Sequence, residues 1–443
     1  VRSDSDMYTL GYSFRPWRQP EVIADGPSIL HYLRETAEAF GIEEKIHYNC
    51  RVRSAHWSSE EACWTVEAVR GPEEEPVLVT CDFLCLGTGY YDYEQGYTPA
   101  WPGIEDFAGQ VVHPQHWPEE LDYTGKRVVV IGSGATAVTL VPAMTGQAAH
   151  VTMLQRSPTY IVARPARGAT GGIRRLLPAR LAYRLARWQS ILFGVYFYAL
   201  TRRRPQLARA QLLRLVRQQL GDEYDIATHF APTYNPWDQR LCLAPDGDFF
   251  TAIKQGKVSV ATDQIETFTA QGIKLRSGQE LSADIIVTAT GLRMKMLGGI
   301  ALVVDGQPVD LSRALIYRGM MYRDIPNLAS VFGYINASWT LKCELIAQRV
   351  CRLLNYMDRH AYASCTPRLG EQAVPEEPML TELTSGYVQR ARDLLPRQGP
   401  DNPWKMHQNY LRDLWSLRLS SVNDGTVEFA RRPAVPAAQS AGA

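Results

Sequence analysis

The chain has 443 residues, of which 21% are charged and 45% are hydrophobic, and its formal net charge is +1. This balance is typical of a globular protein, and it excludes a strongly basic chain that binds nucleic acid through its overall charge. At roughly 150 residues per domain, the length predicts about three packed units, or two large ones with insertions.

The cysteines do not form a recognisable metal or disulfide pattern. There are eight of them, with no CxxC pair and no histidine at a spacing suited to zinc. We therefore expect no metal site, and reduced thiols in a cytoplasmic protein. The chain starts at Val1 without a basic stretch followed by an apolar one, so we expect no signal peptide and a truncated start.

Residues 28 to 120 are expected to form one helix followed by short strands. The helix is "SILHYLRETAEAFGI", and the strands are "IHYNCRV", "CWTVEAV" and "DFLCLGTG", which ends in Gly87-Thr88-Gly89. A later segment, "DIIVTATG" at 284–291, repeats the last pattern. One interpretation is two buried strands with unrelated glycine turns. We favour two dinucleotide-binding folds, each with a strand that ends where the backbone passes a cofactor.

Residues 121 to 164 carry a βαβ pattern with a glycine-rich turn. Strand "RVVVIG" precedes helix "ATAVTLVPAM" and strand "HVTMLQR". In the turn "GSGATA", Gly132 permits the tight bend, Gly134 lets the backbone approach a pyrophosphate, and Ala137 lets the helix pack closely. The free N–H groups at the helix start then bind phosphate. The predicted cofactor-binding residues of this turn are Gly132, Ser133, Gly134, Ala135, Thr136 and Ala137.

The second strand of this unit ends in Gln155 and Arg156. An acidic residue at this place commonly binds a ribose 2'-hydroxyl group. A guanidinium suits a 2'-phosphate instead, so we predict NADPH rather than NADH as the ligand of Gln155 and Arg156. The alternative is a surface arginine at the end of a strand.

A strongly basic segment follows, with thirteen arginines and no acidic residue between Arg164 and Gly221. It contains two stretches with helical periodicity. Its apolar run, Ile191 to Leu200, is far shorter than the roughly 20 residues of a membrane span. A basic amphipathic helix on an anionic membrane is one interpretation. We favour a helical insertion whose apolar face covers the substrate site.

The stretch "FAGQVVHPQHWP" has the spacing FxGxxxHxxxWP. This spacing resembles the fingerprint of the Baeyer–Villiger monooxygenases, flavoproteins that insert an oxygen atom beside a carbonyl. The related N-hydroxylating and S-oxidising flavin monooxygenases usually lack the Trp-Pro ending, and they stay an alternative. We expect the histidine to orient domains rather than to move protons. The motif residues are Phe107, Gly109, His113, Trp117 and Pro118.

Further segments, including "SDSDMYTLGYSFRPW", "YNPWDQRLCL" and "NASWTLK", extend the resemblance over essentially residues 1 to 430. The resemblance implies an α/β fold with two Rossmann-like dinucleotide-binding domains, the FAD domain being split around an NADP domain. The expected boundaries are an FAD part at 1–120, an NADP domain at 121–290 with a helical insertion at about 165–230, a second FAD part at 291–432 and a disordered, low-complexity tail at 433–443.

The family begins with a GxGxxG unit that binds FAD, and that unit has no counterpart in this sequence. We therefore expect an N-terminally truncated chain whose glycine turn at Gly132 belongs to the second dinucleotide fold. An alternative that is not an active enzyme is an NADPH-binding remnant or a gene fragment. A plain flavin reductase is a further one.

The resemblance also implies roles for residues outside the glycine turn. Arg2 and Asp4, with Ser3 between them, match an Arg-x-Asp turn over the flavin and nicotinamide, and the backbone of Val52 matches a contact to the FAD adenine. Arg240 in "NPWDQRLCL" aligns with an arginine that stabilises negative charge developing on oxygen. The catalytic candidates are therefore Arg240 and Asp4. The alternatives are a solvated Asp4, a core strand residue at Val52 and a surface Arg240.

The implied reaction uses NADPH, FAD and dioxygen. It converts a small lipophilic ketone to an ester or lactone, and it oxidises soft sulfur such as that of a thioamide. We expect no nucleic-acid partner. The sequence determines neither the native substrate nor the oligomeric state.

Overall fold

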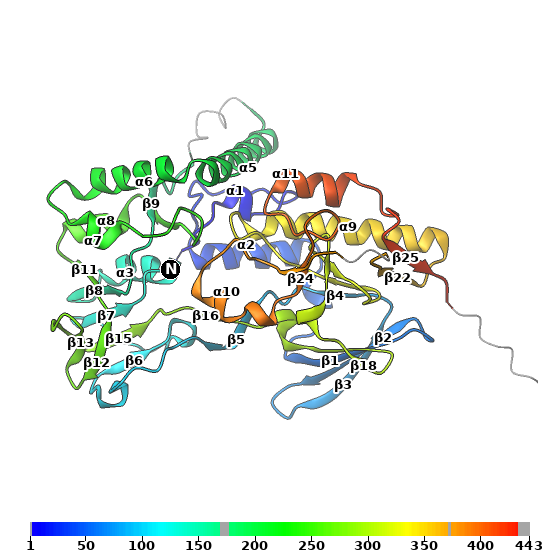
Figure 1. The fold of residues 1–443 in the computed structure, drawn as a ribbon, viewed down its shortest axis with the longest axis horizontal. Helices are drawn as coiled ribbons and strands as arrows, with labels where there is room; N and C mark the ends of the chain where they lie inside the picture. The colour runs from blue at the N-terminus through cyan, green and yellow to red at the C-terminus, as the bar shows by residue number, and fades with distance from the viewer. Residues whose placement is uncertain (1, 169–176, 371–373, 433–443) are drawn as a thin grey trace, which may run out of the picture.

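The computed structural model describes residues 2–168, 177–370 and 374–432. Within them the chain forms two α/β parts, one around a parallel sheet and one around a mixed sheet, which lie side by side in Figure 1. We call these the parallel-sheet part and the mixed-sheet part. The tail at 433–443, for which disorder was predicted, lies outside the described residues.

In the described residues, the parallel sheet of the parallel-sheet part has five strands in the order β11-β8-β7-β15-β6, and all four neighbouring pairs are parallel. Strand β7 reads "RVVVI" and four of its five residues are buried, as expected of a central strand covered on both faces. The bounds are β6 (Gln110–Val112), β7 (Arg127–Ile131), β8 (His150–Gln155), β11 (Val258–Thr262) and β15 (Ile285–Thr288).

One expected boundary is wrong. The parallel-sheet part was expected to start at residue 121, but Gln110 on β6 pairs with Ile285 on β15, so the sheet already begins at β6. The sequence of β6 is only three residues long and carries no periodicity that assigns it to either part. Its hydrogen bonds to β15 decide the assignment.

Further elements complete the parallel-sheet part. Helix α3 contacts α8 and β10 on one side of the sheet, and a three-stranded meander follows β11. The bounds are α3 (Ala135–Met144), β9 (Ile161–Arg164), β10 (Cys242–Pro245), α8 (Asp248–Lys254), β12 (Ile265–Thr269), β13 (Gly272–Leu275) and β14 (Glu280–Ser282).

The helical insertion lies between β9 and β10 and contains α5 (Ala179–Arg203), α6 (Pro205–Leu220) and α7 (Ile226–Phe230). On the inner face of α5, Arg187 forms a buried ion pair of 2.8 Å with Glu344, and the Tyr183 ring meets the Tyr8 ring edge-on at 6.0 Å. No helix in the described ranges combines the length and the apolar character that crossing a membrane requires.

The mixed-sheet part is built from both ends of the chain. Its sheet has the order β18-β17-β1-β2-β3, and a second small sheet pairs β4 with β21 in parallel. The main core cluster lies between these strands and includes Trp57, Trp64 and Leu328. The bounds are α1 (Met7–Leu10), α2 (Gly26–Ala39), β1 (Cys50–Ser58), β2 (Cys63–Arg70), β3 (Glu75–Cys81), β4 (Leu84–Leu86), β17 (Ala301–Val304), β18 (Gln307–Pro308), β21 (Leu328–Ser330), α9 (Trp339–His360), β22 (Ser364–Pro367), α10 (Gly386–Arg390), α11 (Tyr410–Asp413), a π-helical turn at Leu414–Leu419 and β25 (Val427–Ala430).

Two antiparallel strands join the parts, β5 (Tyr91–Gly96) and β16 (Leu292–Met294). Strand β5 follows β4 and its glycine turn, whereas β16 follows β15 and its glycine turn. The two segments with the repeated sequence pattern therefore lead directly into the two strands that cross between the parts. This arrangement confirms the predicted α/β class, with one dinucleotide fold split around the other.

Candidate functional site

The glycine turn between β7 and α3 has the geometry of a phosphate cradle. Gly132 has a φ of +127°, and a Cβ atom there would lie 2.3 Å from the carbonyl oxygen of Ala289, so this position excludes a side chain. A Cβ atom on Gly134, the N-cap of α3, would meet nothing within 4 Å. The first N–H groups of α3 have no partner within the helix, so they can donate to a phosphate in this open space. Ala137, fully buried, packs the helix on the sheet.

Gln155 is the last residue of β8 and Arg156 follows it, and the two side chains lie in different environments. Gln155 is buried, and its Nε2 atom donates 2.8 Å bonds to the His229 carbonyl and to the Thr262 hydroxyl. Its Oε1 atom is buried without a partner among the described residues. Arg156 is exposed, and its guanidinium forms no ion pair with any residue that the structure describes. An exposed and unpaired cation beside the glycine turn is what binding of a 2'-phosphate requires.

The two predicted catalytic residues lie together. Arg240 Nη2 is 2.8 Å from Asp4 Oδ2, and the side chains are 34% and 30% exposed, so the pair is reachable from outside. Burial alone lowers the pKa of Arg240, but the charge of Asp4 and the neighbouring tyrosines outweigh it and raise the pKa. Arg240 is therefore a permanent cation at this place. Two residues further on, Cys242 Sγ lies 3.8 Å from the Ser133 carbonyl, next to the glycine turn.

A cluster of tyrosines surrounds Arg240, and sequence reasoning missed it. The hydroxyl groups of Tyr90 and Tyr91 are 2.9 Å apart, and the Tyr91 ring meets the Tyr387 ring edge-on at 6.0 Å. Burial, followed by the other tyrosines, raises the pKa of both Tyr90 and Tyr91, so both stay neutral hydrogen-bond donors. The signal was available, because "YY" directly follows the strand and glycine turn of "DFLCLGTG".

Two other N-terminal site candidates, Arg2 and Ser3, contact protein groups, and their roles toward the flavin stay predictions. Arg2 forms an ion pair of 3.0 Å with Asp248 on α8, and its Nε atom is buried without a partner among the described residues. Ser3 stabilises its own loop, because its hydroxyl donates to the Ser5 carbonyl at 3.0 Å. Val52 lies on β1, next to a register irregularity, with an exposed side chain, so it is not a core residue.

The loop that carries Arg240 is held from two sides. Asp238 accepts a 2.6 Å bond from Arg202 on α5, and its carbonyl accepts from the Thr384 backbone N–H at 2.7 Å. Trp237 has a φ of +72°, uncommon for a residue with a side chain, and it meets the ring of Tyr198 on α5. Its indole N–H is buried without a partner among the described residues. A strained residue with an unsatisfied donor is typical of a ligand site.

The FxGxxxHxxxWP residues lie against β5 rather than beside Arg240. Gln115 Nε2 donates to the Asp92 carbonyl at 2.7 Å, and His116 Nε2 is 2.9 Å from the Glu94 carbonyl. His113 packs so closely on Gly96 that a Cβ atom there would lie 2.0 Å from its ring. Burial lowers the pKa of His113, and the Gly291 backbone partly opposes this shift. The motif therefore clamps a strand that joins the two parts.

The remaining motif residues support this loop. Phe107 belongs to a buried cluster, and a Cβ atom on Gly109 would lie 2.4 Å from the Asp284 carbonyl oxygen. Trp117 packs edge-on against Tyr123, and the Pro118 carbonyl accepts a turn hydrogen bond. These contacts agree with a role in orienting the parts, which stays a prediction.

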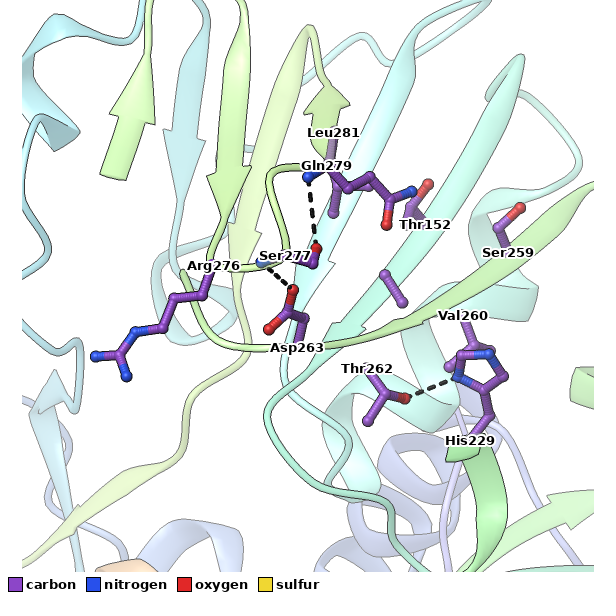
Figure 2. A pocket seen from close by; sticks show the side chains of 11 residues that line it. Thr152, His229, Ser259, Val260, Thr262, Asp263, Arg276, Ser277, Gln279 and Leu281 are labelled. Atoms are coloured by element: carbon purple, nitrogen blue, oxygen red, sulfur yellow. Dashed lines mark hydrogen bonds between the residues drawn. The ribbon is translucent and has the colours of Figure 1, made fainter. Parts of the chain in front are cut away.

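A polar pocket of about 850 Å³ lies at the edge of the parallel sheet (Figure 2). Its lining includes His229, Thr262, Asp263 and Ser277, and none of the predicted site residues. His229 Nδ1 is 2.8 Å from the Thr262 hydroxyl, and both residues also bind the Gln155 amide. The pocket therefore adjoins the end of β8 without containing the Asp4–Arg240 pair.

Comparisons with known proteins agree with this geometry. The chain is 51% identical over 438 residues to the FAD-containing monooxygenase EthA of Mycobacterium tuberculosis, a match that covers 98% of this chain and 88% of that protein. It is 50% identical over 435 residues to the putative FAD-containing monooxygenase MymA of the same species, covering 97% and 88%. These matches do not support the expected loss of an N-terminal unit, and they do not favour an inactive remnant.

Solved structures share the fold at lower identity. A steroid monooxygenase bound to NADP superposes with a TM-score of 0.72 at 21% identity, covering 97% of this chain and 91% of that one. OTEMO in complex with FAD and NADP gives 0.71 at 20% identity, with the same coverage. Residues 17–296 match the sequence model of the flavin-binding monooxygenase-like family. With these residues matched and half of all positions shared with named monooxygenases, the chain belongs to the flavin-binding monooxygenase-like family.

Proposed function

We propose that the chain is an NADPH- and dioxygen-dependent flavin monooxygenase of the Baeyer–Villiger type. The observation that carries this proposal is the Asp4–Arg240 ion pair of 2.8 Å, held beside the glycine turn and accessible to ligand. In the overall reaction, ketone, dioxygen, NADPH and a proton give ester or lactone, NADP⁺ and water. The relatives EthA and MymA are named as FAD-containing monooxygenases, and OTEMO forms a complex with FAD and NADP.

The residues present fit both cofactors in different ways. For NADPH, the glycine turn offers helix N–H groups to the pyrophosphate and Arg156 offers a cation to the 2'-phosphate. For FAD, two buried donors that have no partner in the described part of the chain, Arg2 Nε and Trp237 Nε1, suit the carbonyl and ring-nitrogen acceptors of a flavin. When bound, FAD supplies the redox chemistry between NADPH and dioxygen.

Arg240 stabilises negative charge that develops on oxygen during transfer to the carbonyl. Its fork of N–H donors is fixed in direction by Asp4 and cannot be deprotonated at working pH. Removing such a donor typically lowers the rate by about 100-fold or more. Tyr90 and Tyr91 stay neutral and keep this region from presenting a competing negative charge.

The same arrangement serves the oxidation of a soft sulfur atom, such as that of a thioamide. Here sulfur is the nucleophile: its lone pair attacks the oxygen that is transferred, and Arg240 stabilises the negative charge left on the other oxygen atom. This second substrate class rests on the same cation, so one variant tests both.

The test is a paired measurement of NADPH consumption and of product formed from a simple ketone or a thioamide, with isotope-labelled dioxygen. We expect label in the ester or sulfoxide. Arg240→Ala is expected to keep most NADPH consumption and to lose at least about 100-fold of the product. Arg240→Lys is expected to restore little, because a single ammonium group does not reproduce the planar fork. Product formation that stays coupled to NADPH consumption in Arg240→Ala would refute the role of Arg240.

A further inference from the structure

We propose that the outer face of α5, together with the adjoining helical turns at 410–419, docks on an anionic membrane surface. We call this surface the α5 face. Its apolar members on α5 are Leu181, Leu185, Trp188, Leu192, Tyr196 and Leu200, and those on the adjoining turns are Leu411, Trp415 and Leu419.

The α5 members form a continuous stripe in which every side chain is at least 38% exposed. They recur at spacings of three or four residues, so they share one side of the helix. Leu192 is 49% exposed and Tyr196 is 64% exposed. The favoured sequence interpretation, an apolar face turned toward a substrate site, is therefore wrong for this stripe. The inward face of α5 instead uses Tyr183, Arg187 and Ile191.

The stripe continues onto the turns at 410–419. The Trp188 ring meets the Tyr410 ring edge-on at 6.0 Å, and Figure 1 shows α5 and α11 along the same edge of the molecule. Trp415 is 60% exposed and Leu419 is 67% exposed. Contiguous exposed apolar side chains of this kind mark a contact surface in a monomeric protein. Trp and Tyr rings are also the side chains that prefer the boundary between membrane and water.

The charge of the surrounding residues selects the partner. The whole chain has a net charge of +1, yet the segment from Arg164 to Gly221 has thirteen arginines and no acidic residue. On α5 and its ends, Arg180, Arg184, Arg203 and Arg204 are exposed, and none of them forms an ion pair with a described residue. Two copies of this face would bring unpaired arginines together, whereas anionic lipid headgroups neutralise them.

The opposite side of α5 contacts the loop that carries Arg240. Tyr198 packs on Trp237, and Arg202 binds Asp238, two residues before Arg240. A docked α5 face therefore places the loop of Arg240 close to the membrane, where a lipophilic substrate is dissolved. This consequence for substrate supply rests on the proposed function, whereas docking itself does not.

The test measures binding of the 443-residue chain to vesicles by sedimentation, without any catalytic readout. Vesicles of phosphatidylcholine are compared with vesicles that also contain phosphatidylglycerol, at low and high salt. We expect binding to the anionic vesicles that weakens with salt. Leu185→Glu with Leu192→Glu is expected to lower the affinity about tenfold or more. Arg180→Gln and Arg184→Gln are expected to lower it about fivefold each.

A matched control is Leu78→Glu, because Leu78 is 69% exposed and belongs to β3 of the mixed sheet. Figure 1 shows β3 at the opposite edge of the molecule from α5. Circular dichroism and thermal unfolding verify that each variant is folded. The proposal fails if the chain ignores anionic vesicles, or if Leu78→Glu weakens binding as much as the α5 variants. It also fails if light scattering shows a dimer that the α5 substitutions convert to monomer, because the face then binds a second copy. Arg240→Ala, the variant expected to lose oxygenation, should still bind anionic vesicles. Its vesicle binding therefore tests docking independently of the proposed function.

Discussion

Replacing Arg156 by alanine is expected to weaken the binding of NADPH far more than that of NADH. Arg156 stands at the end of β8, beside the glycine turn, with an exposed guanidinium and no ion pair among the described residues. Its removal leaves no acidic side chain unpaired. The free energy of unfolding should therefore change by no more than about 0.5 kcal/mol, and the change in affinity reports the ligand contact alone.

The magnitude follows from the exposure of this side chain. A hydrogen bond to a charged group contributes about 1.5–3 kcal/mol. Because the guanidinium lies at the surface, we expect the lower limit of this range, about 1.5 kcal/mol, which corresponds to roughly a tenfold loss of NADPH affinity. NADH has no 2'-phosphate, so its affinity should stay within about twofold of the original value.

The assay is an equilibrium titration of each nicotinamide cofactor, followed by its fluorescence, which does not depend on oxygenation. Arg313→Ala is the matched control, since Arg313 is likewise exposed and without an ion pair in the described chain but lies in the mixed-sheet part. Equal losses for NADPH and NADH, or an equal effect of Arg313→Ala, would refute the assignment of Arg156 to the 2'-phosphate.

Three further predictions concern stability. The Lys342 ammonium lies 3.1 Å from the Asp413 carboxylate in the interior. Lys342→Met leaves this carboxylate without its cation, so a urea titration should show a free energy of unfolding lower by about 3–5 kcal/mol. Adding Asp413→Leu removes the unpaired charge and should recover most of the lost stability. Gly96→Ala should lower the melting temperature because the new Cβ atom meets the His113 ring, at a cost of about 1–3 kcal/mol, whereas Gly146→Ala, in open space, should not. Burial alone raises the pKa of Asp424, but hydrogen bonds from Arg318 and Tyr317 outweigh it and lower the pKa. A carboxyl group whose pKa is lower in the folded state than in the unfolded state stabilises the fold at pH values above the unfolded pKa. This contribution to the free energy of unfolding should be lost as the pH falls below about 4. Urea titrations at each pH should show a smaller loss over that range for Asp424→Asn.

The phosphate cradle could be predicted from sequence because all of its parts are contiguous. Strand β7, the turn at Gly132 and helix α3 occupy successive residues, and the bounds of α3 agree with the expected helix "ATAVTLVPAM". Local hydrogen bonding and the φ of a glycine suffice to form such a unit. The position of Arg156 at the strand end follows from the same local order.

The tertiary structure alone decided how distant segments meet. Periodicity marks the apolar side of α5 but does not say whether the protein covers it. In the structure the inner face of α5, which includes Tyr183 and Arg187, is buried, and the stripe is exposed. Arg2 binds Asp248, 246 residues away, rather than joining Asp4 and Arg240. Contacts of this kind depend on which surfaces the sheets bring together, and no local rule of sequence contains that information. The sequence therefore determined the cradle and its chemistry, and the packing of the two parts determined which side chains share the site and which face the outside.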